Sequence, residues 1–144
     1  MLISAGNKEI FEGVYPIGIG MIDVAINLSK LCFFNKPDFL LFIASAGSYG
    51  EYKIFDIVES SSATNIELCF LQDKGYTPID NACSNEINFC KNESIVNSSN
   101  YITTDLALGN KFNNYGIGIE NMEFFSIIRT AQQFDIPVGG IFVV

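Results

Sequence analysis

The sequence predicts an α/β fold built on a central mixed sheet that helices cover on both faces. Two uninterrupted apolar runs, residues 39–44 and 138–144, have the length and composition of central strands. An amphipathic helical pattern precedes each run. The length of 144 residues suits one hydrophobic core, so we expect a single domain over residues 1–144.

Composition excludes several classes of function. Histidine is absent, which removes the commonest general base and the commonest zinc ligand, and no metal or cofactor is predicted. The net charge is −8 and Arg129 is the only arginine. A polyanionic duplex would be repelled by such a chain, so we expect no nucleic-acid partner.

Hydropathy and cysteine usage predict a cytoplasmic protein without a membrane partner. No apolar run reaches the roughly 18 residues of a membrane span, and the N-terminus lacks a basic segment before a long apolar core. The four cysteines are widely spaced without a C-x-x-C pair, which favours reduced thiols. A disulfide between Cys83 and Cys90, which share a polar loop, is the less favoured alternative.

The first candidate site residue follows an N-terminal strand at residues 1–5. The strand runs into the turn at residues 6–9, and such a turn often delivers its polar residue to the carboxyl edge of a sheet. Here that residue is Glu9. The alternative is an ordinary exposed loop glutamate.

The second candidate is a glycine turn at the start of a helix. Residues 14–19 are extended, and Gly18 and Gly20 lead into a helix whose apolar stripe includes Val24 and Leu28. A helix N-terminus entered through glycines suits an anion. Asp23 replaces the third glycine of a dinucleotide fingerprint, so a plain strand-to-helix turn is favoured over a nucleotide phosphate site.

The apolar strand at residues 39–44 ends in small residues. Ser45, Ala46 and Gly47 leave a hydroxyl and backbone groups at its carboxyl end, where ligands of open α/β sheets gather. An ordinary strand-end turn is an equally good interpretation.

The middle of the chain predicts edge strands and a polar loop. Residues 54–71 show two strand patterns, with alternation over residues 65–71, and residues 72–92 form a polar loop. After a short strand at residues 94–96, Tyr101 is placed to stack on a flat ligand or to join the core. Residues 104–112 predict a helix capped by Thr103 or Thr104.

The last helix follows the polar run at residues 120–123 and continues through Phe134. A carboxylate at a helix start is held charged by free N–H groups and the helix dipole. Glu123 is therefore the principal candidate for binding a polar ligand. The pattern places Glu123, Ser126, Thr130 and Gln133 on the polar side of this helix.

The order of these segments from about residue 15 onward resembles the nucleoside phosphorylase superfamily, both its purine nucleoside phosphorylases and its methylthioadenosine/adenosylhomocysteine nucleosidases. The resemblance rests on Gly18-Ile19-Gly20, Lys36-Pro37-Asp38, Ser45-Ala46-Gly47, Ser99-Asn100-Tyr101-Ile102, Asn121-Met122-Glu123 and Phe134-Asp135-Ile136-Pro137. It implies a three-layer α/β/α fold with a central mixed twisted sheet, shortened between Glu9 and Gly18.

The resemblance also implies roles for particular residues. Glu123 would accept hydrogen bonds from the ribose 2′ and 3′ hydroxyls, and Glu9 would orient water. The remaining substrate-binding residues would be Met122 and Asn121 near the sugar, Tyr101 stacked on the purine, the Ile102 backbone at the purine edge, and Ser45, Ala46 and Gly47 beside the sugar and the nucleophile. An anion near the ribose suits a reaction with oxocarbenium character.

Two departures from the family pattern bear on the chemistry. No arginine stands near residues 42–44, so hydrolysis is favoured over phosphorolysis, with phosphate kept as an alternative nucleophile. The family's aspartate that protonates the departing base lies just beyond the strand that matches residues 138–144, and the sequence stops before it. Slow cleavage is therefore expected.

Three hypotheses of function follow. The first is cleavage of a purine nucleoside N-glycosidic bond, by a nucleosidase or phosphorylase type of reaction. The second is nucleoside binding without catalysis. The third is a structural domain whose polar loop at residues 72–92 contacts a protein. The resemblance also implies a homo-oligomer in which a neighbour completes the pocket.

Overall fold

In the part of the chain that the structure describes, ten strands in two sheets form the framework. The computed structural model describes residues 1–85, 90–91 and 93–144. In spatial order, the first sheet contains β2 (Tyr15–Pro16), β1 (Leu2–Ser4), β3 (Leu40–Ser45), β10 (Val138–Val143) and β5 (Ile57–Ser60). The second contains β4 (Gly47–Ser48), β9 (Ile117–Asn121), β8 (Ile95–Ser98), β6 (Ser62–Thr64) and β7 (Ala82–Ser84).

Strand directions within both sheets are mixed. In the first sheet β1, β2, β3 and β10 are parallel, and β5 pairs with β10 in the antiparallel direction. In the second sheet β6, β8 and β9 are parallel, whereas β4 and β7 are antiparallel edges. The predicted α/β class with a mixed sheet is confirmed, with the strands divided between two hydrogen-bonded sheets.

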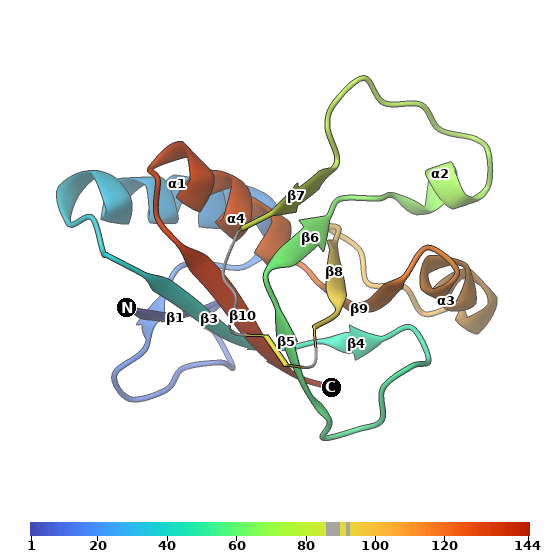
Figure 1. Cartoon of the computed structure of the whole chain (residues 1–144), viewed down its shortest axis with the longest axis horizontal. Coiled ribbons are helices and arrows are strands. Elements are labelled where there is room, and N and C mark those ends of the chain that lie inside the picture. The colour runs from blue at the N-terminus through green and yellow to red at the C-terminus, as the bar shows by residue number, and fades with distance from the viewer. Residues whose placement is uncertain (86–89, 92) are drawn as a thin grey trace.

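The helices are α1 (Gly20–Phe34), α2 (Leu68–Leu71), α3 (Leu106–Asn113) and α4 (Phe124–Gln133). Figure 1 shows α1 and α4 side by side over the strands, with α3 at the opposite end of the molecule. Helix α1 buries Val24, Leu28 and Cys32, one residue per turn, against the core. None of the helices described is long and apolar enough to span a membrane.

Three phenylalanines fix the start of α4 on the first sheet. Phe124 packs against Phe42 of β3 and Phe142 of β10, with ring centroids 6.1 Å and 5.1 Å away. A Cβ at Gly140 would lie 2.9 Å from the Phe124 ring, so a glycine is needed for this close approach. Because Glu123 immediately precedes Phe124, this packing also fixes the glutamate.

Three sequence-based predictions are wrong. Residues 65–71 do not form a strand: Leu68–Leu71 is a short helix whose Leu71 enters a small second core with Phe112. The α3 cap is Asp105, whose side chain accepts a hydrogen bond from the Leu108 amide, because it stands directly before the first helical residue.

The third error concerns the polar side of α4. Ser126 and Thr130 are buried rather than exposed. The Ser126 hydroxyl donates to the Met21 carbonyl at 2.7 Å, where α4 packs on α1. The part of this side that carries Ser126 therefore packs on α1, whereas Gln133 of the same side is exposed as predicted. The predicted polar loop at residues 72–92 contains strand β7 and partly lies outside the described residues.

Candidate functional site

The candidate site is a cavity of about 450 Å³ at the edge where β1, β3 and β9 end. Fourteen residues line it: Ala5, Gly6, Asn7, Lys8, Glu9, Ile19, Ser45, Ala46, Gly47, Ile102, Glu120, Asn121, Met122 and Glu123. The carboxyl ends of parallel strands are where α/β sheets bind ligands. Eight of the predicted site residues, including both predicted catalytic glutamates, line this cavity.

Glu9 is held at the end of β3. Its Oε1 accepts hydrogen bonds from the Ser45 amide at 2.8 Å and from the Ser45 hydroxyl at 2.6 Å. The turn that carries Glu9 is itself fixed, because the Ser4 hydroxyl donates to the Glu9 carbonyl at 2.7 Å. Both side-chain bonds use one oxygen, which leaves Oε2 able to accept a proton from a water.

Glu123 is a buried carboxylate at the start of α4, only 4% exposed. Its Oε1 accepts from the Gly20 amide at 2.9 Å, and its Oε2 accepts from the Met122 amide at 3.1 Å. Burial raises the pKa of the Glu123 carboxyl and the charge of Glu9 raises it further, while the Gly20 amide opposes the shift. The amides satisfy one acceptor position on each oxygen and leave others for a ligand.

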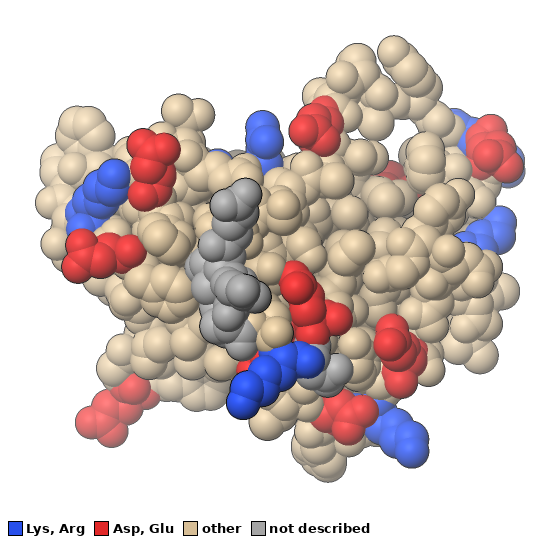
Figure 2. Space-filling model, viewed as in Figure 1, with Lys and Arg blue, Asp and Glu red and all other residues tan. Residues whose placement is uncertain are grey.

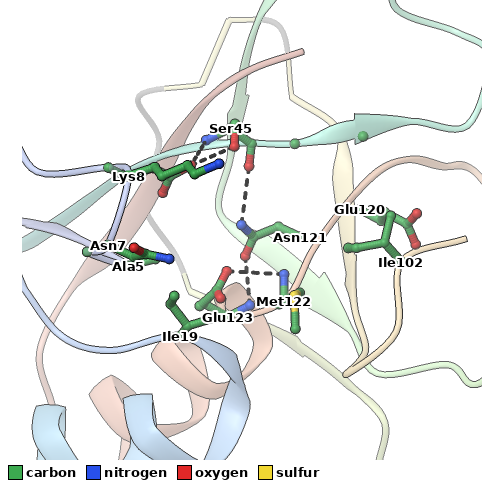
Figure 3. A pocket seen from close by; sticks show the side chains of 14 residues that line it. Ala5, Asn7, Lys8, Ile19, Ser45, Ile102, Glu120, Asn121, Met122 and Glu123 are labelled. Atoms are coloured by element: carbon green, nitrogen blue, oxygen red, sulfur yellow. Dashed lines mark hydrogen bonds between the residues drawn. The ribbon is translucent and has the colours of Figure 1, made fainter.

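Asn121 joins the two sides of the site. Its side-chain oxygen accepts from the amides of Glu123 at 2.8 Å and Phe124 at 3.0 Å, and so satisfies the open end of α4. Its side-chain nitrogen donates to the Ser45 carbonyl at 3.3 Å. Figure 3 shows this chain of bonds from Ser45 through Asn121 to Glu123. These bonds fix the distance between the end of β3 in the first sheet and the end of β9 in the second.

Glu120 also lines the cavity and was not predicted as a site residue. It is 3% exposed and its two oxygens accept from the Tyr49 hydroxyl and the Thr103 amide, each at 2.7 Å. Burial raises the pKa of its carboxyl, and these two bonds oppose the shift. The sequence signal was a charged residue directly after the apolar run Ile117-Gly118-Ile119, within the same strand β9.

The predicted anion-binding glycines and Tyr101 lie outside the cavity lining. The Gly20 amide donates to Glu123, so the chain's own carboxylate occupies the helix start. Gly18 has φ of +106°, and a Cβ there would lie 3.0 Å from Asp23, which makes it a turn residue. The Tyr101 side chain is 81% exposed. Its neighbour Ile102 does line the cavity.

The chemistry of the lining favours a neutral, polar ligand with an apolar part. Its charged side chains are Lys8, Glu9, Glu120 and Glu123, a net negative set. Apolar contact is offered by Ile19, Ala46, Ile102 and Met122. Among the residues that the structure describes, no group of three or more His, Cys, Asp or Glu is arranged to hold a metal ion.

Comparison with solved structures identifies proteins of the same fold. A mutant Helicobacter pylori MTAN with 5′-methylthioadenosine in its active site superposes with a TM-score of 0.80 at 13% identity, over 99% of this chain and 82% of that one. The Campylobacter jejuni 5′-methylthioadenosine/S-adenosylhomocysteine nucleosidase superposes with a TM-score of 0.80 at 14% identity, over 99% of this chain and 83% of that one.

A futalosine hydrolase mutant from Helicobacter pylori gives a TM-score of 0.79 at 14% identity, over 99% of this chain and 83% of that one. No protein-family model and no curated protein sequence matches the chain. At these identities the likeness concerns the fold, which is the one that the sequence resemblance implied. The chain therefore has the fold of the 5′-methylthioadenosine/S-adenosylhomocysteine nucleosidases.

Proposed function

We propose that this protein binds a purine nucleoside and cleaves its N-glycosidic bond. The observation that carries the proposal is the pair of carboxylates, Glu9 and Glu123, in one cavity at the strand ends of a nucleosidase fold. Solved proteins with this fold include enzymes named for cleaving methylthioadenosine, adenosylhomocysteine and futalosine. That this chain cleaves such a bond is our inference.

In this proposal Glu123 holds the ribose. A carboxylate offers about four acceptor positions, and the Gly20 and Met122 amides use two of them. Two remain, which matches the two hydroxyls of a ribose. Positive charge develops on the sugar as the bond breaks, and a buried anion stabilises that charge most strongly where water is excluded.

Glu9 then activates water. The water oxygen forms a bond to the anomeric carbon, and the bond from that carbon to the base nitrogen breaks with its electron pair going to the base. Glu9 accepts one proton from the water. The departing base takes a proton from solvent, and Glu9 returns its own proton to solvent when the products leave. The two Ser45 bonds keep Glu9 oriented during this transfer.

Hydrolysis is preferred over phosphorolysis because of the charge of the lining. Among the described lining residues, three are glutamates and only Lys8 is positively charged, so a phosphate would enter a site of net negative charge. Phosphate remains the alternative nucleophile, and the assay below includes it.

The flat base is assigned to the Ile102 end of the cavity. Figure 3 shows Ile102 and Glu120 at one end of the site and Ala5, Asn7 and Lys8 at the other, with Asn121 and Glu123 between them. With the ribose at Glu123, the base extends towards Ile102. Tyr101, exposed beside Ile102, is available at the entrance for stacking.

A cytoplasmic homo-oligomer is part of the proposal. All four cysteines are free thiols, which suits a reducing compartment. Ile22, Ile26 and Phe33 share one face of α1 and are exposed, a pattern of side chains that a second copy would cover. Light scattering of wild-type protein and of Ile22→Asp tests this: a wild-type monomer contradicts it.

The Lys and Arg side chains visible in Figure 2 are scattered over that face and form no continuous basic surface. This scatter supports the proposal that nucleic acid is not a partner.

The experiment that tests the function is incubation of the protein with adenosine, inosine and 5′-methylthioadenosine, with and without phosphate, followed by chromatography of released base. Base release without phosphate supports hydrolysis, and release only with phosphate supports phosphorolysis. Calorimetric binding without release in either condition would leave a nucleoside-binding protein. Neither binding nor release would refute the proposal.

A further inference from the structure

We propose that Glu120 is a positioning residue that holds the segment at residues 100–105 against the sheet and thereby fixes the base-binding end of the cavity. The inference rests on the function proposed above, because it assigns the base to the Ile102 end. It concerns a residue that neither the sequence motifs nor the assigned chemistry uses.

The segment that Glu120 holds has no regular structure of its own. Residues 100–105 lie between β8 and α3 and form neither helix nor strand. The amide of Thr103, next to Ile102, donates to Glu120 Oε1 at 2.7 Å. The nearby bonds of this segment, from Ser99 to Tyr101, are local and do not reach β9. Glu120 is thus a hydrogen-bonding tie between the Ile102 wall and the strand beneath it, made to the Thr103 amide and to the Thr103 side chain.

The opposite oxygen of Glu120 is fixed by a buried network whose direction can be assigned. Asn97 Oδ1 accepts from the Thr64 hydroxyl at 3.0 Å and the Ile66 amide at 2.8 Å. Asn97 Nδ2 must therefore be the donor to the Tyr49 hydroxyl, at 3.4 Å. Tyr49 in turn donates its proton to Glu120 Oε2 at 2.7 Å.

Both oxygens of Glu120 therefore act as acceptors. Tyr49 is rigid, since its ring stacks on Phe112 with centroids 4.3 Å apart and it is 3% exposed. Glu120 accepts from a rigid donor of the core on one oxygen and from an irregular segment on the other, so it links the position of Ile102 to the core. An apolar residue at position 120 would leave two donors unsatisfied and release the segment.

If Glu120 holds the Ile102 wall, its removal lowers the affinity for the base and not the affinity for the ribose. Free adenine and adenosine both need the Ile102 wall, whereas the ribose of adenosine is held separately by Glu123. We expect Glu120→Ala to lower the affinity for adenine and for adenosine by the same factor, about tenfold. This is the effect of losing one hydrogen bond to a charged group. Glu120→Gln keeps an oxygen for the Thr103 amide and restores most of that affinity.

Calorimetry with adenine and adenosine on wild type, Glu120→Ala, Glu120→Gln and the exposed control Glu12→Ala measures these affinities. Amide hydrogen exchange of residues 100–105 without ligand gives a second readout, and Glu120→Ala is expected to exchange faster there than wild type or Glu12→Ala. Should Glu120→Ala fail to fold, Glu120→Gln still tests the inference, since it is expected to retain slow exchange at Thr103 and adenine affinity within about threefold of wild type.

Two results would overturn the inference: unchanged exchange and unchanged adenine affinity in folded Glu120→Ala, or a Glu120→Gln protein that binds adenine as poorly as Glu120→Ala. The second result would mean that the charge itself contacts the ligand. Wild-type protein that binds neither adenine nor adenosine would refute the proposed function, and the exchange comparison would still decide whether Glu120 holds the segment.

Discussion

Replacement of Glu123 by glutamine gives a quantitative test of the ribose site. The carboxylate offers about four acceptor positions, of which the Gly20 and Met122 amides use two. Glutamine has a single oxygen with two positions. If the Gly20 amide keeps one, a single position remains for a ribose with two hydroxyls, and the new amide group opposes the Met122 N–H.

At least one ribose hydroxyl therefore loses a charge-assisted hydrogen bond in Glu123→Gln. Such a bond contributes about 1.5–3 kcal/mol, which corresponds to a loss of affinity of roughly 10- to 150-fold. Free adenine does not reach Glu123 and is expected to bind as it does to wild type. Calorimetry with adenosine and adenine on both proteins measures the difference, with Glu12→Gln as an exposed control.

The reasoning is refuted if adenosine and adenine lose affinity equally, because the glutamate would then affect the whole cavity rather than the ribose. Unchanged binding of both ligands in a folded Glu123→Gln protein would refute it as well. Circular dichroism of each variant establishes that the comparison is made between folded proteins.

Three further predictions follow from the contacts. Ser45→Ala removes the 2.6 Å bond to Glu9 but keeps the amide bond, so kcat for base release should fall about tenfold with little change in KM; an unchanged kcat contradicts the role of Glu9. Phe124→Ala should lower the free energy of unfolding by about 3–5 kcal/mol in urea titrations, and Phe124→Leu by clearly less; equal losses contradict the packing argument. Burial raises the pKa of Glu120 and Glu123 above the ordinary 4.5, so the folded state binds more protons than the unfolded state above that pH. The free energy of unfolding should fall as pH rises from about 4.5 through the raised values, and less steeply when both residues are glutamine.

Much of the candidate site could be predicted because it depends on local order along the chain. Ser45 follows an apolar run, and Glu123 precedes an amphipathic helix, so both positions at strand and helix ends are visible in the pattern. Glu9 and Ser45 meet because β1 and β3 are parallel neighbours whose carboxyl ends share one edge of the first sheet. Glu123 follows β9 of the second sheet and reaches the same cavity beside Asn121, which bonds to the Ser45 carbonyl.

The errors have long-range causes. Residues 65–71 alternate like a strand, but the Ile66 amide bonds to the Asn97 side chain and Leu71 is recruited into the second core. Tyr101 lies outside the cavity lining with its side chain exposed, two residues before the Thr103 amide that bonds to Glu120, and its role in stacking stays a prediction. No periodicity encodes either contact.

The sequence by itself determined the α/β class, a helix entered through Gly18 and Gly20, a last helix after the polar run at residues 120–123, and the placement of carboxylates at element ends. These follow from hydrophobic period and local hydrogen-bonding geometry. Tertiary structure alone decided that the Gly20 amide binds Glu123 rather than a ligand anion, and that Glu120 is buried between Tyr49 and Thr103. These pairs are 103, 71 and 17 residues apart in the chain, so only folding brings each donor to its acceptor.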